Sequence, residues 1–243
     1  MVEPGSSRAS AALPILTEPY GLWRLLRALP QTWYAILMRP KLFFGGIDGA
    51  RGPVLLNAIG FLAIALTAYI AFQTAFEEVL LRAFDFQGST FVGYYAVAYA
   101  GYDGVLGDAI AFFLILGLFA SACAFQLLYL SGGLWVFMGW YDHFGKVPSL
   151  KAIAAAVAYA IGFVLLTFIL ASAPLIALSW NTAPTSLLYA FGPFTAGDNV
   201  KYELVLTYFY VRAVSFATGA KLHWGMVFTA LLLYAIVFIA SAF

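Results

Sequence analysis

The sequence is poor in charged residues and contains a single cysteine. Asp, Glu, Lys and Arg make up 9% of its 243 residues, against about 25% in a typical soluble domain. One cysteine excludes an internal disulfide and a zinc site built on paired cysteines. Because Cys123 lies inside a long apolar run, a small buried residue is its favoured role. No basic run is dense enough to indicate nucleic-acid binding.

Catalytic motifs are missing as well. Gly145-Lys146 is followed by Val147, which excludes a phosphate-binding loop of the Gly-x-x-x-x-Gly-Lys-Ser/Thr type. The sequence has neither a His-Glu-x-x-His motif nor a Gly-x-Ser-x-Gly elbow. Residues 1–20 lack the continuous apolar core of a signal peptide. We therefore predict that the protein is not an enzyme, with no catalytic residue, no metal site and no cofactor.

What the chain has instead is a series of long apolar runs. Hydrophobic residues make up 64% of it, more than one soluble core of this length buries. About 20 apolar residues in helical form cross the hydrocarbon core of a membrane. The runs are Val54–Phe76, Ala109–Met138, Ala152–Leu178, Tyr202–Thr218 and Met226–Phe243. The predicted fold class is all-α, a polytopic membrane protein with five transmembrane helices.

The charges between these runs are sorted by sign. Alternate links are rich in cations, at Arg8, Arg24, Arg27, Arg39, Lys41, Arg51, Lys146, Lys151 and Lys221. The other links hold Arg82 and Lys201 beside many acids, at Glu77, Glu78, Asp85, Asp103, Asp108, Asp198 and Glu203. Because positive links stay in the cytoplasm, the sorting predicts a cytoplasmic N-terminus and a C-terminus outside.

The sequence divides into three parts. We expect a cytoplasmic tail at 1–18, an interfacial amphipathic segment at 19–52, and at 53–243 the five-helix transmembrane domain with an outer loop at 77–107. In the second part Leu22, Leu25, Leu26 and Leu29 share one helical face, while Arg24 and Arg27 share the other. Pro30 breaks the pattern, and two shapes are open: a hairpin with a second short helix at Gln31–Met38, or one kinked helix. A helix lying in the membrane plane and a leader packed on the spans both explain the pattern.

Small residues spaced by four mark faces where helices can approach closely. The pairs are Gly117 with Ser121, Ala120 with Ala124, and Ala158 with Gly162. In lipid, such faces are where van der Waals packing between helices is best. They predict helix packing and carry no chemistry.

One ionisable residue interrupts an apolar run. Arg212 lies near the middle of Tyr202–Thr218, where a charge costs about 2.5–3.5 kcal/mol or more. A buried partner or an anionic ligand would explain it, and so would snorkelling of the side chain to the inner headgroups. Further candidates for contact with a partner or ligand are Gln126 in the second run and four residues of the inner links, Trp140, Asp142, His143 and His223. For the two histidines a capping or headgroup-binding role is favoured over haem ligation.

The inner links resemble those of a known family. The stretch Trp140–Tyr159 contains Gly145, Lys146, Ser149 and Lys151 ahead of an early tyrosine in the third span, Tyr159. The turn Lys221-Leu222-His223-Trp224-Gly225 and the segment Pro40-Lys41-Leu42-Phe43-Phe44 also look like family motifs. Together they resemble the Yip family of Rab-interacting, five-span membrane proteins over about residues 30–243.

In the family that the chain resembles, eukaryotic members act in vesicle traffic and contact prenylated Rab GTPases. The short N-terminal tail resembles bacterial members, so the expected location is the bacterial cytoplasmic (inner) membrane, with membrane lipids and other membrane-protein subunits as partners. Binding of Rab GTPases is not carried over to any residue. We expect a non-enzymatic scaffold or accessory subunit of a larger assembly. The alternative is a small-solute transporter or channel using Arg212 near the bilayer midplane with Gln126, and lipid handling also stays open.

Overall fold

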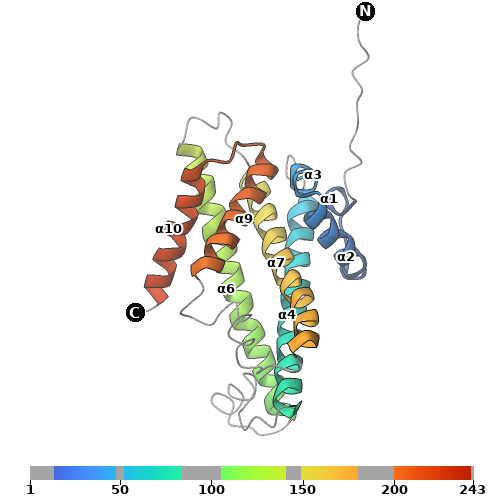
Figure 1. Cartoon of the computed structure of the whole chain (residues 1–243). Coiled ribbons are helices and arrows are strands. Elements are labelled where there is room, and N and C mark those ends of the chain that lie inside the picture. The colour runs from blue at the N-terminus through green and yellow to red at the C-terminus, as the bar shows by residue number, and fades with distance from the viewer. Residues whose placement is uncertain (1–13, 48–51, 84–104, 141–148, 180–199, 242–243) are drawn as a thin grey trace, which may run out of the picture.

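Within the residues that the computed structural model describes, which are 14–47, 52–83, 105–140, 149–179 and 200–241, the chain is all-helical (Figure 1). The helices are α1 (Pro14–Thr17), α2 (Leu22–Met38), α3 (Pro40–Gly45), α4 (Gly52–Ala83), α6 (Val105–Trp140), α7 (Leu150–Ser179), α9 (Val200–Thr218) and α10 (Trp224–Ser241). The apolar runs become helices because a helix satisfies its own backbone hydrogen bonds. The predicted all-α class is confirmed for these residues.

The long helices α4, α6, α7, α9 and α10 lie side by side and alternate in direction (Figure 1). Helix α7 is at the centre, because α4, α6 and α9 all pack against it. Its residues 155–163 are all buried. The short helices α1, α2 and α3 gather at the end of the bundle where α4 begins (Figure 1).

Three of the helices are long and apolar enough to cross a membrane. The candidate spans among the described residues are Pro53–Phe72, Phe112–Trp140 and Leu150–Leu170. Helix α10 contributes a shorter apolar stretch, Trp224–Leu233. The chain is therefore a plausible multi-pass membrane protein. The count of five spans and the orientation stay predictions.

The seam between α4 and α7 uses the small residues that the sequence singled out. Ala158 is fully buried. A Cβ atom on Gly162 would lie 2.7 Å from the Phe61 ring and 3.3 Å from the Cα atom of Leu62. The two backbones therefore approach too closely for a larger residue at this position. The prediction that Ala158 and Gly162 form a helix-packing face is confirmed.

The N-terminal part differs from expectation in two places. The end of the expected cytoplasmic tail 1–18 is packed on the bundle, because Ile15 and Leu16 are each 3% exposed and α1 packs against α4. Of the two shapes expected around Pro30, the hairpin of two separate helices is not found, since α2 runs from Leu22 to Met38 with this proline inside it. Buried residues occur on both sides of this proline, at Leu25 before it and at Thr32 and Ile36 after it. Tertiary packing therefore overrides the weak helix propensity of proline.

The predicted outer loop 77–107 is also too long. Helix α4 continues to Ala83, and α6 begins at Val105. The stretch after Phe76 reads Glu-Glu-Val-Leu-Leu-Arg-Ala, and most of these residues favour helix. The middle of the expected loop, 84–104, lies outside the described residues.

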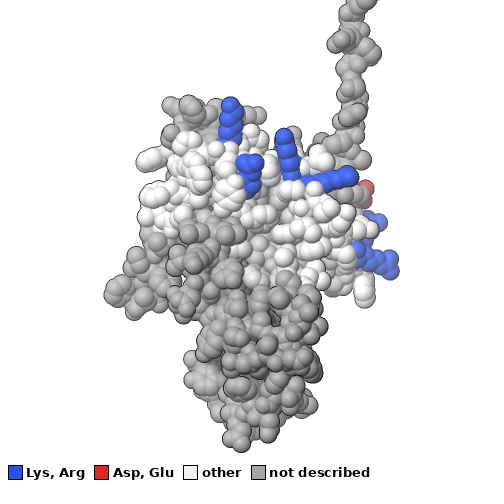
Figure 2. Space-filling view, in the orientation of Figure 1, with Lys and Arg blue, Asp and Glu red and all other residues white. Residues whose placement is uncertain are grey.

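The Lys and Arg side chains that the structure describes lie toward one end of the bundle. Figure 2 shows the Lys and Arg side chains on the half of the molecule that carries α1, α2 and α3. They come from the short N-terminal helices, the start of α7 and the last turns and link of α9, at Arg24, Arg27, Arg39, Lys41, Lys151, Arg212 and Lys221. The side chains of Arg82 and Lys201, and those of the acids in the other links, lie outside the described part of the structure, so the charge sorting stays a prediction from the sequence.

Candidate functional site

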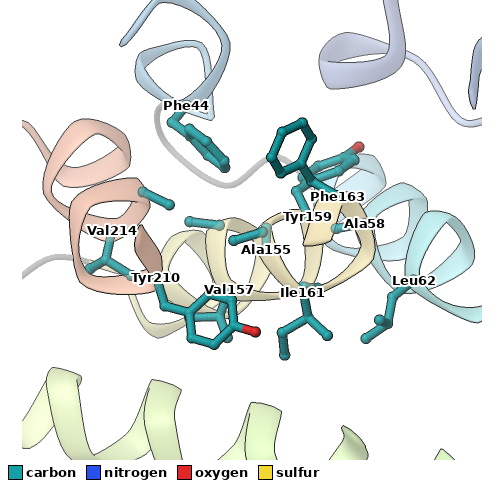
Figure 3. Close-up of a cluster of buried hydrophobic side chains, with 14 of the residues drawn as sticks. Phe44, Ala58, Leu62, Ala155, Val157, Tyr159, Ile161, Phe163, Tyr210 and Val214 are labelled. Atoms are coloured by element: carbon teal, nitrogen blue, oxygen red, sulfur yellow. The ribbon is translucent and has the colours of Figure 1, made fainter. Parts of the chain in front are cut away.

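An aromatic cluster joins the short helix α3 to the centre of the bundle. Tyr159 of α7 is fully buried, and its ring centroid lies 5.1 Å from that of Phe43 and 5.5 Å from that of Phe61. Figure 3 shows Tyr159 and Phe163 on the side of α7 that faces Phe44 of α3. The segment 40–44 and the early tyrosine of the third run, which the sequence marks separately, therefore meet in space.

The same cluster reaches two more helices. Phe163 lies 5.4 Å from Phe209 of α9 and 6.1 Å from Trp33 of α2, measured between ring centroids. Phe44 lies 6.4 Å from Phe209. The hydroxyl of Tyr159 has no hydrogen-bond partner among the described residues. Chemically the cluster is an apolar core that ties α2, α3, α4, α7 and α9 together.

A buried asparagine holds the first helix in place. Asn57, fully buried in α4, donates through Nδ2 to the carbonyl oxygens of Ile15 and Glu18, at 2.7 Å each. Its Oδ1 accepts a hydrogen bond from the backbone N–H of Tyr20 at 3.0 Å. Every polar atom of the side chain is thus engaged, which buried polar groups require. The sequence analysis missed Asn57, although an amide side chain inside an apolar run was a usable signal.

A second polar contact holds α2 against α7. The indole Nε1 of Trp33 donates to Oγ1 of Thr167 at 2.9 Å. That hydroxyl in turn donates to the carbonyl oxygen of Phe163 at 2.8 Å. Because the N-terminal helices are packed on α4 and α7, the leader alternative of the sequence analysis is correct for the inner face of α2. Its outer face remains exposed.

Arg212 is not paired with an acid among the described residues. Its Cζ atom lies 4.6 Å from the ring centroid of Phe216, one turn further along α9. Residues on this part of α9 also contact α3, since Gly45 faces the carbonyl oxygen of Phe216. The side chain therefore reaches toward the end of α9 that carries Lys221. This direction fits the snorkelling alternative, and the described part of the chain holds no acidic partner for the other alternative.

The other candidate contact residues do not form one site. Gln126 is half-buried on α6, a helix that does not pack along α9, so the structure does not bring it to Arg212. Trp140 is 89% exposed at the end of α6. Asp142 and His143 lie outside the described residues. Nor do the described side chains include a group of His, Cys, Asp or Glu that could hold a metal ion.

His223 has the capping role that was favoured for it. It immediately precedes α10, and its Nδ1 accepts a hydrogen bond from the backbone N–H of Gly225 at 3.0 Å. Such a bond satisfies one of the free N–H groups in the first helical turn. The chain reaches this position through Gly219, whose φ of +67° suits glycine.

Helix α6 presents a face that no described helix covers. Gly117, Ala120, Ser121 and Ala124 are all exposed. A Cβ atom on Gly117 would meet nothing within 4 Å. In an 18-residue apolar window of the candidate span Phe112–Trp140, 17% of the residues are buried, against 61% in the corresponding window of Leu150–Leu170. The predicted packing faces on α6 are therefore free of any described helix of this chain, unlike the Ala158–Gly162 face.

Comparison with known proteins adds no identity. No family model, curated protein or solved structure matches the chain.

Proposed function

We propose that the chain is a non-enzymatic integral membrane protein that acts as a scaffold or accessory subunit in a larger membrane assembly. The observation that carries this proposal is the exposed small-residue face of α6. Gly117, Ser121 and Ala124 lie within about 60° of one another around the helix, since successive residues turn by about 100°. A helix of another subunit would fit against this face.

Small residues on an outer face favour a helix partner over lipid. Acyl chains gain little from glycine or alanine, whereas a second helix can approach its backbone closely there and gain van der Waals contacts. The hydroxyl of Ser121 donates to the carbonyl oxygen of Gly117 at 2.8 Å. The face therefore needs no water to satisfy this polar group. The same kind of contact occurs within the chain, where Gly162 allows α4 to approach α7 closely.

The proposed topology has five spans, with the N-terminus in the cytoplasm and the C-terminus outside. Its support is the alternating direction of the long helices (Figure 1) and the excess of cations in alternate links of the sequence. Cations stay on the cytoplasmic side of a membrane. A bacterial inner membrane is the proposed location.

A Yip-like architecture is part of the proposal. Its support is that two sequence segments chosen for their resemblance, 40–44 and the early tyrosine at 159, contact one another through Phe43 and Tyr159. The contact gives these residues a shared packing role in the bundle. Rab binding is not proposed for any residue.

Co-purification tests the proposal. The tagged full-length protein is isolated from its native membrane in mild detergent, and the proteins that accompany it are identified. Ala124→Leu should remove or weaken the accompanying subunit, because the larger side chain fills the face where its helix packs. Ala122→Leu is the matched control, since this exposed residue lies about 160° away on the same helix. A protein that purifies alone, or equal losses in the two variants, would contradict the proposal.

A further inference from the structure

Helix α2 has three distinct faces. At about 100° per residue, the buried residues Leu25, Thr32 and Ile36 form one sector that packs on the bundle. A second sector is exposed and apolar, with Leu22 at 64%, Leu26 at 36% and Leu37 at 47% exposure. The third sector is exposed and polar. It consists of Arg24, Arg27 and Gln31, which lie within about 60° of one another.

Contacts with the bundle fix the rotation of α2 about its own axis, so the helix cannot turn its exposed apolar sector inward. The side chain of Leu25 packs against Gly60 of α4. A Cβ atom added to Gly60 would lie 2.6 Å from the Cδ1 atom of Leu25. On the next turns, the Trp33 indole is hydrogen-bonded to Thr167 of α7. The exposed apolar sector of α2 therefore stays turned outward. Because burial of apolar surface stabilises by about 25 cal/mol per Å², an apolar medium that covers this sector is favoured over water.

The polar sector and the link beyond the end of α2 together carry net positive charge. Arg24 lies 3.7 Å from Glu18, with both side chains more than half exposed, so this pair contributes little. Arg27, and also Arg39 and Lys41 just beyond the end of α2, are exposed, and their side chains form no ion pair or hydrogen bond with another described residue. Figure 2 shows this cluster of cations, with one acidic patch beside it.

We propose that this surface of α2, together with the Arg39–Lys41 link, binds the headgroups of anionic phospholipids. The acyl chains of the same lipids cover Leu22, Leu26 and Leu37. A helix with a cationic sector beside an apolar one suits the boundary between headgroups and acyl chains. An acidic protein segment would satisfy the arginines but would leave the leucine sector exposed to water, so the lipid is the better occupant.

The test uses the full-length protein in mild detergent with an equimolar mixture of phosphatidylglycerol and phosphatidylcholine that have identical acyl chains. Native mass spectrometry gives the ratio of the two lipids that stay bound. The wild type is expected to retain phosphatidylglycerol preferentially. Each cation near an anionic surface contributes roughly five-fold to binding. Because Arg24 is already paired with Glu18, the double variant Arg24→Gln/Arg27→Gln should lower this preference by between about five-fold, for one effective cation, and about 25-fold, for two.

The matched control is Lys151→Gln/Lys221→Gln, which removes two exposed cations at the same end, one from the start of α7 and one from the link between α9 and α10. It should keep the preference within about two-fold of the wild type. All substituted residues are exposed, and thermal unfolding in detergent checks that each variant folds. Equal retention of the two lipids by the wild type, or equal losses in the two double variants, would overturn the proposal. So would displacement of the bound lipid by inorganic phosphate or by a polyglutamate peptide.

Discussion

The ring of Phe43 meets the ring of Tyr159 edge to face, with centroids 5.1 Å apart and planes at 90°. Edge-to-face contact is a favoured arrangement for aromatic pairs. Phe43 belongs to the six-residue helix α3, whereas Tyr159 belongs to the central helix α7. A helix as short as α3 is not stable alone. Its place therefore depends on this contact and on the packing of Phe44 against α9.

Replacing the Tyr159 ring and removing its hydroxyl should have different effects. Tyr159→Phe removes a buried hydroxyl that has no partner among the described residues, so stability should be unchanged or higher by about 1 kcal/mol. Tyr159→Ala leaves a cavity beside Phe43 and Phe61 and should cost about 3–5 kcal/mol. Unfolding of both variants in detergent measures the difference. A large loss in the phenylalanine variant would show that the hydroxyl is engaged.

Gly162 should tolerate no side chain. A Cβ atom there would lie 2.7 Å from the Phe61 ring and 3.3 Å from the backbone of Leu62. Gly162→Ala should therefore lower the free energy of unfolding by about 1–3 kcal/mol, as overpacking does. Gly117→Ala is the control, because a Cβ atom at this position would have nothing within 4 Å. It should be neutral or stabilising by up to about 1 kcal/mol through helix propensity, and equal effects at both positions would contradict the packing argument.

Asn57 should determine whether α1 stays on α4. Asn57→Ala removes three hydrogen bonds to residues 15–20 and leaves buried backbone groups unpaired, at a cost of about 2 kcal/mol or more. Limited proteolysis should then cut the N-terminal segment faster. Thr67→Ala on the same helix is the control. Its exposed hydroxyl bonds the carbonyl oxygen of Ala63 within α4, so its removal should change stability by less than about 0.5 kcal/mol. Unchanged cleavage in Asn57→Ala would refute the role.

Arg212 should contribute modestly to stability. Its guanidinium stacks on the ring of Phe216, and such a cation–π contact is worth about 0.5–1 kcal/mol where water reaches the pair. We expect Arg212→Leu to shift the free energy of unfolding by less than about 1 kcal/mol and to leave assembly intact. Arg212→Lys, which keeps the charge, serves as the comparison. A loss of about 3 kcal/mol or more with leucine would instead indicate a buried ionic partner.

Much of the helical architecture follows from local sequence. The expected runs Val54–Phe76 and Ala152–Leu178 lie within α4 and α7, whose observed bounds are Gly52–Ala83 and Leu150–Ser179. Periodicity says less about where a helix ends. The outer turns of α4 contain Glu77 and Glu78, and polar residues that are good helix formers extend the helix beyond its apolar part.

The candidate site was harder to predict, because its residues come from distant segments. Sequence reasoning marked Phe43 and Tyr159 separately, and it had no means of pairing them. It placed Arg212 with Gln126 in one hypothetical path, whereas the structure puts them on helices that do not pack along each other. It did not single out Asn57 or Thr167, since a polar residue in an apolar run shows its partner only when the neighbouring element is in place.

The sequence by itself determined that this chain is helical, apolar and unevenly charged, because a long apolar run must satisfy its backbone within a helix. Tertiary structure decided which of the small-residue faces would be used. Ala158 and Gly162 are covered by α4, while Gly117 and Ser121 are left exposed on α6. The reason is physical: spacing creates a face, but contact depends on the shape of what lies opposite. Phe61 and Leu62 fit the groove at Gly162, and no described helix reaches the one at Gly117.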